Sequence, residues 1–331
     1  MRKSMFLFAS VIALAVISTQ VYATVWRVNA APGSSAHYTT LQAAHDASST
    51  VNGDTIYLEG SPFSSGGLTC TKVLTIIGAG YFLDQNPQTQ ANPNPSKIDN
   101  YTYFQSGSEG SKIMGCHFTY PLYLYVGNIT IERNYFYTGQ YMVYAYYANV
   151  NNVRIINNYF DNVYYYHTLY FPNACSNILI SNNYIKGYIT TGVNFSGFIT
   201  NNILSSSATV YNATLTNNIM TDGYLTASNC NITYNIGNNT QFGNQNGNQQ
   251  NVNMTNVFVG ATGNSTDGQW QLKAGSTAIG AGEGGVDCGM YGGAYPYRLS
   301  GLPPIPAVYY FNAPSLPTNN IQVSLKAKSH N

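Results

Sequence analysis

The sequence Ile155-Ile-Asn-Asn158-Tyr-Phe160 is one copy of a short repeat in the middle of this chain. Each copy starts with an aliphatic residue and carries an asparagine three positions later. The other copies are Ile131-Glu-Arg-Asn134-Tyr-Phe136, Ile180-Ser-Asn-Asn183-Tyr-Ile185, Ile199-Thr-Asn-Asn202-Ile-Leu204, Leu215-Thr-Asn-Asn218-Ile-Met220 and Ile232-Thr-Tyr-Asn235-Ile236, with Ile113-Met-Gly-Cys116-His-Phe118 as a degenerate one. The asparagines lie between 16 residues (Asn202 to Asn218) and 25 residues (Asn158 to Asn183) apart. A repeat this short is typical of a solenoid built from strands.

The residue types of the repeat predict strands and turns, because β-branched, aromatic and Asn residues dominate and helix-forming residues are scarce. One copy cannot bury its own apolar side chains, so we expect the copies to stack in parallel, about 4.8 Å apart. The first positions would form one buried column: Ile113, Ile131, Ile155, Ile180, Ile199, Leu215 and Ile232. The last positions would form a second: Phe118, Phe136, Phe160, Ile185, Leu204 and Met220. The sequence therefore predicts an all-β, parallel β-helix.

The repeated asparagines are expected to form a structural ladder. Asn tolerates the left-handed backbone conformation of a tight bend, and its amide can hydrogen-bond to the asparagines in the turns above and below. Stacked amides satisfy one another, so we interpret this column as part of the wall rather than as a binding site. Its members are Asn134, Asn158, Asn183, Asn202, Asn218 and Asn235.

Further segments carry a resemblance to a known family. They are Tyr38-Thr-Thr-Leu-Gln-Ala-Ala-His-Asp-Ala47 with Val51-Asn-Gly-Asp-Thr-Ile-Tyr-Leu-Glu-Gly60, then Thr75-Ile-Ile-Gly-Ala-Gly80, and finally Gly275-Ser-Thr-Ala-Ile-Gly-Ala-Gly282 with Asp287-Cys-Gly289. With the repeats, they make most of residues 25–293 resemble the pectate-lyase-like superfamily, and more closely its secreted bacterial members. The resemblance implies a right-handed parallel β-helix with a short N-terminal capping helix. It does not select a function, because members include lyases, hydrolases and adhesins.

The N-terminal residues have the pattern of a secretion signal. Arg2 and Lys3 precede an apolar run, and Val21-Tyr22-Ala23 fits a cleavage site. We therefore expect a secreted protein, either extracellular or at the cell surface. The expected organisation is a signal peptide at 1–23, the β-helix at 24–293 and a small β and Pro-rich C-terminal cap or appendage at 294–331.

The composition favours uncharged partners. The net charge is +1 and charged residues make up 8% of the chain, whereas nucleic acids and anionic membranes require clustered Lys and Arg. No apolar run beyond the signal is long enough to span a membrane. The 30 Tyr and 14 Phe residues supply apolar surface for a core. We therefore expect a polysaccharide or cell-surface glycan as partner, and neither nucleic acid nor a membrane span.

The sequence predicts no cofactor. The five cysteines are widely spaced, without a CxxC pair or a His/Cys cluster, and are expected to be small buried side chains. Glu283 and Asp287 flank a Gly-rich turn, but two carboxylates are a weak signal for calcium. We interpret that segment as a turn and assign no metal site.

A catalytic site has few candidate residues. Lyases of this fold need a Lys or Arg base, and hydrolases need two or three carboxylates close together. Asp161 and Lys186 each lie three residues after their repeat asparagine, which places them side by side in adjacent turns. Together with His167 and Arg154 they are the candidate catalytic residues. The alternative, which we favour, is a solvated ion pair and a packed histidine.

The tyrosines crowd into the first half of the β-helix. Neighbours in a strand face opposite sides, so tandem tyrosines must present rings outward and would form an exposed aromatic strip. Such a strip suits neutral sugar rings or protein contacts, and the alternative is packing under a covering loop. The candidate ligand-binding residues are Tyr144, Tyr146, Tyr147, Tyr164, Tyr165 and Tyr166.

These features leave three hypotheses for the function. The first is a non-catalytic secreted or surface β-helix that binds glycans or other surfaces through its Tyr-rich side. The second is a polysaccharide lyase or glycoside hydrolase that uses Asp161 and Lys186, with His167 or Arg154. The third is a structural subunit that self-associates through its uncharged, amide-rich, aromatic surface.

Overall fold

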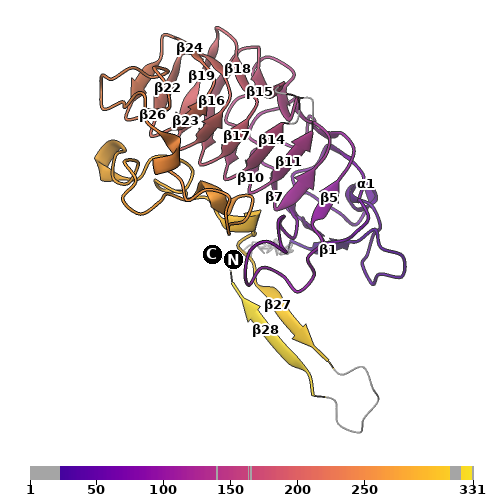
Figure 1. Cartoon of the computed structure of the whole chain (residues 1–331). Coiled ribbons are helices and arrows are strands. Elements are labelled where there is room, and N and C mark those ends of the chain that lie inside the picture. Colours follow the sequence, from indigo (N-terminus) through magenta and orange to yellow (C-terminus); the bar gives the residue numbers. More distant parts are fainter. Residues whose placement is uncertain (1–22, 139–140, 163, 165, 314–321, 330–331) are drawn as a thin grey trace, which may run out of the picture.

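Each repeat forms two strands joined by a tight corner, and a third strand completes one turn of a right-handed parallel β-solenoid of about 9 turns (Figure 1). In one such turn, β13 (Arg154–Ile156) leads through the corner Asn157-Asn158 into β14 (Tyr159–Asn162), and β15 (His167–Phe171) follows. The computed structural model describes residues 23–138, 141–162, 164, 166–313 and 322–329.

The strands stack into three parallel sheets, called sheets 1, 2 and 3 in the order in which a repeat visits them. Sheet 1 contains β1 (Val25–Val28), β2 (Thr55–Leu58), β4 (Thr75–Ile77), β7 (Lys112–Met114), β10 (Thr130–Glu132), β13, β16 (Cys175–Ser181), β19 (Phe195–Thr200), β22 (Ala213–Thr216) and β25 (Asn231–Thr233). Sheet 2 contains β5 (Ser96–Ile98), β8 (Cys116–Phe118), β11 (Tyr135–Thr138), β14, β17 (Tyr184–Lys186), β20 (Ile203–Ser205), β23 (Ile219–Asp222) and β26 (Ile236–Gly237). Sheet 3 contains β3 (Leu68–Cys70), β6 (Thr102–Phe104), β9 (Leu122–Leu124), β12 (Val143–Ala145), β15, β18 (Tyr188–Thr191), β21 (Ala208–Tyr211) and β24 (Leu225–Ser228).

The strand register confirms both predicted columns of the core. Ile155 pairs with Ile131 in one neighbouring turn and with Ile180 in the other, and all three side chains are fully buried. In the second column, Phe136 stacks on Phe118 and on Phe160 with ring centroids 4.6 and 4.8 Å apart. The apolar interior is thus continuous along the solenoid axis.

The asparagine ladder also lies in this interior. The side-chain oxygen of Asn183 accepts hydrogen bonds from the backbone N–H and the amide of Asn158, at 2.8 and 3.0 Å. The amide of Asn183 donates in turn to Asn202 and to the carbonyl of Ile155. The same pattern extends to Asn248, which lies in a polar tract that the sequence analysis did not include in the ladder.

The left-handed conformation that we expected of the ladder asparagines belongs to the residue before each of them. Positive φ angles occur at Asn157 (59°), Asn182 (56°), Asn201 (55°) and Asn217 (58°), and Arg133 takes this place in an earlier turn. The ladder residue itself is therefore free to point its amide inward, because its neighbour makes the bend. The repeated Asn-Asn pair combines these two separate requirements.

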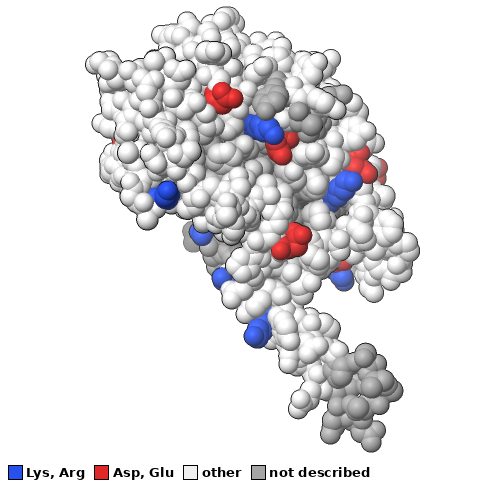
Figure 2. All heavy atoms as spheres, viewed as in Figure 1, with Lys and Arg blue, Asp and Glu red and all other residues white. Residues whose placement is uncertain are grey.

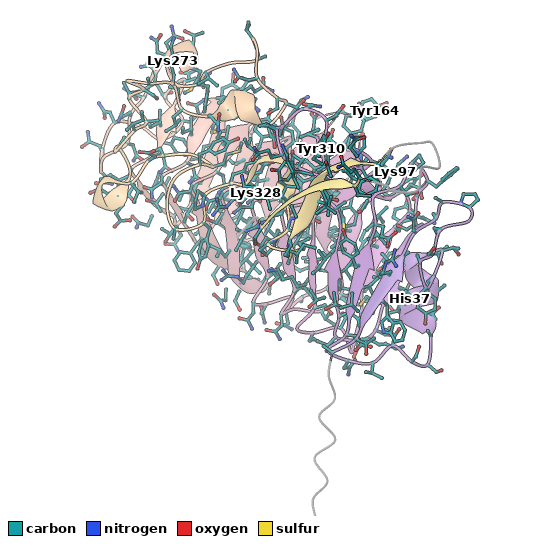
Figure 3. All side chains as sticks on the ribbon, turned by 90° about the horizontal axis from the view of Figure 1, so that it is seen from below. His37, Lys97, Tyr164, Lys273, Tyr310 and Lys328 are labelled. Atoms are coloured by element: carbon teal, nitrogen blue, oxygen red, sulfur yellow. The ribbon has the colours of Figure 1, made fainter. Side chains whose placement is uncertain are left out.

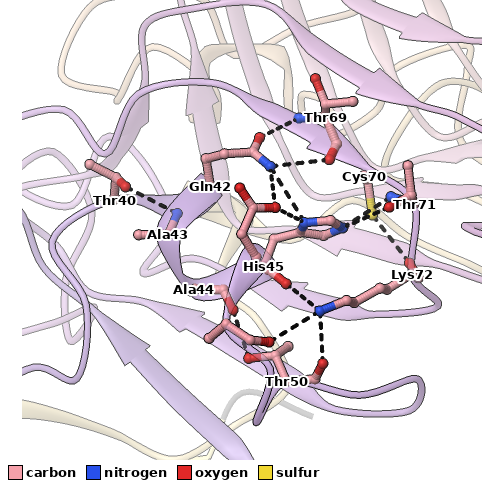
Figure 4. Close-up of polar contacts among 12 residues, drawn as sticks. Thr40, Gln42, Ala43, Ala44, His45, Thr50, Thr69, Cys70, Thr71 and Lys72 are labelled. Atoms are coloured by element: carbon pink, nitrogen blue, oxygen red, sulfur yellow. Dashed lines mark hydrogen bonds and ion pairs between the residues drawn. The ribbon is translucent and has the colours of Figure 1, made fainter.

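A short helix, α1 (Leu41–Asp46), packs against the first turn at the N-terminal end of the solenoid. Thr40 caps it by accepting a hydrogen bond from the Ala43 N–H, and Leu41 and Ala44 enter the core. The Lys72 ammonium donates to three carbonyls at the end of the helix, those of His45, Ala47 and Thr50 (Figure 4). These contacts satisfy carbonyls that a helix end leaves without intrahelical partners.

The chain after the last turn runs back along the solenoid towards its N-terminal end (Figure 1). Residues 252–302, here called the strap, contain short 3₁₀ turns: η1 (Met254–Asn256), η2 (Gly268–Trp270), η3 (Glu283–Gly285) and η4 (Leu299–Gly301). The strap covers the outer face of sheet 2, where Tyr159 and Tyr184 pack with strap residues in a second apolar cluster. Trp270 stacks on Tyr184 and donates to the Tyr159 hydroxyl.

The left-handed corner residues hold the strap in place. Asn182 donates to the carbonyls of Met290 and Gly292, and Asn217 accepts from the Glu283 N–H. In the earlier turn, Arg133 donates to the carbonyl of Leu302 at 2.7 Å. The further along the chain a corner lies, the earlier in the strap are the residues that it binds. The strap therefore runs antiparallel to the direction in which the solenoid winds.

Beyond the strap, an antiparallel hairpin of β27 (Ala307–Asn312) and β28 (Ser324–Lys328) projects from the body (Figure 1). It carries Tyr310 and Lys328, and the Ala91 N–H donates to the carbonyl of Val308 at its base (Figure 3). Its apolar side chains are largely exposed, including Phe311 and Leu325. Within the described ranges, no helix is both long and apolar enough to cross a lipid bilayer.

Candidate functional site

The outer face of sheet 3 carries one hydroxyl-bearing residue in every turn. The register places these residues directly above one another, and their side chains point away from the core because the residues on either side of them point inward. The column, here called the hydroxyl column, consists of Thr69, Tyr103, Tyr123, Tyr144, Tyr170, Thr190, Thr209 and Thr226. At about 4.8 Å per turn, it is roughly 34 Å long.

The tyrosine rings of the column lean on one another. Ring centroids are 5.4 Å apart between Tyr103 and Tyr123, 5.6 Å between Tyr123 and Tyr144, and 5.0 Å between Tyr144 and Tyr170. The first pair is stacked, with ring planes 20° apart, and the other two pairs are tilted by 51° and 53°. All four side chains are half-buried. Within the described part of the chain, none of these four hydroxyls has a hydrogen-bond partner, so they are available to a ligand or to water.

The hydroxyls of Tyr123, Tyr125 and Tyr144 stay protonated at neutral pH. Burial, reinforced by the neighbouring tyrosines, raises the pKa of Tyr123 to about 12. The pKa of Tyr125 and of Tyr144 is raised for the same reasons, desolvation first. The eight strands of sheet 3 contain no Asp, Glu, Lys or Arg. The face is therefore an uncharged array of groups that both donate and accept hydrogen bonds.

Further aromatic residues flank the column. Tyr125 and Tyr146 stack at 4.9 Å on one side of it, and Tyr147 packs edge-on against both. At the N-terminal end of the column, an open depression of about 380 Å³ is lined by Tyr101, Tyr103, Asn100 and the backbone near Thr69, among others.

The predicted ligand-binding tyrosines fall into two groups. Tyr144 lies in the hydroxyl column, and Tyr146 and Tyr147 lie beside it. Tyr164 and Tyr166 are 71% and 58% exposed in the turn between β14 and β15, and Tyr165 lies outside the described residues (Figure 3). Other tyrosines are not on this face at all, because Tyr159 and Tyr184 are buried under the strap.

The predicted catalytic residues come from three different sheets. Asp161 and Lys186 are paired in register on sheet 2 and form an ion pair of 2.8 Å, as their spacing predicted. Arg154 lies on sheet 1. His167 lies on sheet 3, where its Nδ1 contacts the Thr190 hydroxyl at 2.7 Å. The structure therefore brings two of the four candidates together.

The surroundings of His167 are those of a packed residue in the aromatic face. Its ring stacks on Tyr141, with centroids 5.7 Å apart, and packs against Tyr170. Burial lowers its pKa, so the imidazole is neutral at pH 7.

The described residues contain no group of three or more His, Cys, Asp or Glu side chains arranged to hold a metal ion. Asp287 instead accepts a hydrogen bond from the Gly280 N–H, within the Gly-rich turn. All five cysteines are free, and only Cys230 among them is partly exposed.

No protein-family model, no curated protein and no solved structure matches this chain. The parallel β-solenoid is shown by the pairing of its strands. Membership of the pectate-lyase-like superfamily stays a prediction from the sequence.

Sequence reasoning singled out tandem tyrosines and missed the threonine half of the column. The signal was present in short segments that alternate an inward apolar residue with an outward Tyr or Thr. Examples are Leu122-Tyr-Leu124 and Ala208-Thr-Val210. The strands of sheet 3 lie outside the Asn repeat, at a varying number of residues from it. Their alignment with one another therefore becomes visible only in the strand pairing of the structure.

Proposed function

We propose that this protein binds neutral polysaccharides through the hydroxyl column and the tyrosines beside it. The observation that carries the proposal is the alignment of Tyr103, Tyr123, Tyr144 and Tyr170 with Thr190, Thr209 and Thr226 in a single uncharged column. An extended glycan also repeats a hydroxyl-bearing unit at nearly regular intervals.

The chemistry of the column supports this class of ligand. One turn of the solenoid rises about 4.8 Å, which is close to the length of one sugar residue in an extended chain. A glycan lying along the solenoid axis would meet one hydroxyl per residue, and the ring edges of the tyrosines offer apolar contact to its C–H groups. The absence of Asp, Glu, Lys and Arg from the strands of sheet 3 fits an uncharged polymer.

Binding to insoluble and soluble neutral polysaccharides tests the proposal. The decisive variant is the double substitution Tyr123→Phe and Tyr144→Phe, which keeps both rings and removes two hydroxyls. We expect about tenfold weaker binding, because each lost hydrogen bond contributes about 0.5–1.5 kcal/mol. The matched control is Tyr310→Phe, on the exposed hairpin, which should bind like the wild type.

Two results would overturn the proposal. One is a failure of the wild-type protein to bind any neutral polysaccharide. The other is equal binding by the double variant and the control. Binding should also persist at high salt, because neither partner carries charge at the contact.

A further inference from the structure

A second surface, on sheet 1, differs from the hydroxyl column in its charge. A pocket of about 320 Å³ lies between the outer face of sheet 1 and the strap. Lys112, Glu132 and Arg154 enter it from sheet 1, Arg133 from the corner, and Tyr295 and Arg298 from the strap. The pocket exists only because the strap lies beside the sheet.

The pocket concentrates positive charge in a chain that has little charge of either sign. Figure 2 shows how sparse charged side chains are on one face of the molecule. Four of the chain's 13 Lys and Arg residues line this pocket, and Glu132 is the one carboxylate among its lining residues. Four positive charges and one negative charge leave an excess of three.

Glu132 does not neutralise the guanidinium groups of Arg154 and Arg298. Its oxygens contact Lys112 at 2.6 Å and Arg133 at 3.2 Å. Within the described ranges, neither Arg154 nor Arg298 has a carboxylate within ion-pair distance. Burial lowers the pKa of Arg133. The Glu132 carboxylate raises this pKa, and the positive charge of Arg298 lowers it, so the two cations repel each other.

Several contacts hold the cationic groups in place. Asn157 donates to the carbonyl of Tyr295 at 2.8 Å and accepts from the Arg298 N–H at 3.0 Å, which fixes the strap on both sides of the pocket. The Arg154 guanidinium lies 5.7 Å from the centre of the Tyr295 ring, within cation–π distance. These contacts fix the backbone of the strap beside sheet 1, from which the exposed side chains of Arg298 and Arg154 reach the pocket.

We infer that this pocket binds a tetrahedral oxyanion, a phosphate or sulfate group, between Arg154, Arg298 and Lys112. Guanidinium groups donate paired hydrogen bonds to such oxyanions. A phosphate carries up to two charges and several acceptor oxygens, so it can engage several cations at once. A carboxylate offers two oxygens in one plane, fewer than the three or four oxygens of a phosphate or sulfate group, and so would reach fewer of these cations. The group can be free in solution or esterified to a polymer.

Calorimetry with the full-length protein at about 0.15 M NaCl tests this site. The probes are inorganic phosphate, inorganic sulfate, a sulfated polysaccharide and a polyuronate. We expect phosphate or sulfate to bind with a dissociation constant below about 1 mM. Tighter binding of the sulfated polysaccharide than of the free ions would identify a polymer-borne group, and equal binding would identify the free ion.

The variants Arg154→Gln and Arg298→Gln should each weaken oxyanion binding at least about tenfold, because hydrogen bonds to charged groups contribute about 1.5–3 kcal/mol. Lys273→Gln, outside the pocket, is the control and should leave binding unchanged. A second variant, Glu132→Gln, should strengthen binding by removing the one carboxylate.

Three results would overturn the inference: no binding of phosphate or sulfate by the wild type, equal binding by the arginine variants, or preference for the polyuronate. The neutral polysaccharides that test the hydroxyl column carry no such group, so the two sites can fail separately.

Discussion

At the scale of single residues, the Asn-Asn pair shows how one short motif meets two requirements. The first asparagine makes the left-handed bend and hydrogen-bonds to the strap, as at Asn182. The second, such as Asn183, is buried and links three consecutive turns through its amide. Arg133 can replace the first asparagine, because its guanidinium also reaches the strap.

We expect Asn183→Ala to lower the free energy of unfolding by about 3–5 kcal/mol, since it removes the buried side-chain hydrogen bonds to Asn158, Ile155 and Asn202 and leaves the Asn158 backbone N–H without its acceptor. The control is Asn177→Gly. Glycine tolerates the positive φ angle of residue 177, and the substitution removes only an exposed hydrogen bond to Asn152. It should cost less than about 1 kcal/mol. Urea denaturation measures both, and equal losses would contradict a special role for the buried ladder.

At the scale of elements, the strap and the solenoid are joined by a buried carboxylate. Asp267 is fully buried and accepts hydrogen bonds from the Ser300 N–H at 2.6 Å and from the Asn86 amide at 3.0 Å. The Tyr297 hydroxyl contacts Asp267 and also bonds to Tyr81. Residues far apart in the chain thus meet around one side chain.

Replacing Asp267 by Ala should loosen the strap, because it leaves several buried donors without an acceptor. We expect limited proteolysis within residues 268–302 to become about tenfold faster while the far-ultraviolet circular dichroism of the solenoid is kept. Asp222→Ala is the control, since that carboxylate is exposed and bonds locally to the Gly223 N–H. Unchanged cleavage would show that the strap is held mainly by its apolar contacts.

At the scale of the whole molecule, the two surfaces for which we propose binding lie on different faces of one solenoid. Sheet 3 presents uncharged hydroxyls, sheet 1 presents the cationic pocket, and the strap covers sheet 2. The hairpin lies near the cationic pocket, since its Lys328 and the pocket residue Arg298 line one depression, and it exposes apolar side chains to solvent.

A chain that ends at Pro306 should therefore fold with nearly the same stability. The hairpin contributes few contacts to the body, among them the Ala91–Val308 hydrogen bond and one between Lys328 and Gln88. An isolated hairpin is marginally stable, so we expect its removal to change the free energy of unfolding by less than about 1 kcal/mol. Urea denaturation of both chains checks this, and a loss of several kcal/mol would show that the hairpin belongs to the cooperative unit.

The sequence by itself determined the parallel solenoid, its two apolar columns and the pairing of Asp161 with Lys186. It could do so because stacking repeats places equivalent positions one above the other, whatever the length of the loops between them.

Only the tertiary structure decided what covers each face. The strap buries Tyr159 and Tyr184 yet leaves Tyr123 and Tyr144 uncovered, although all four side chains point away from the core. The cationic pocket needs Arg298 from the strap beside Arg154 from sheet 1, residues that no repeat relates. Such contacts depend on the path of a segment without periodicity, and periodicity is the only long-range information that a single sequence of this kind carries.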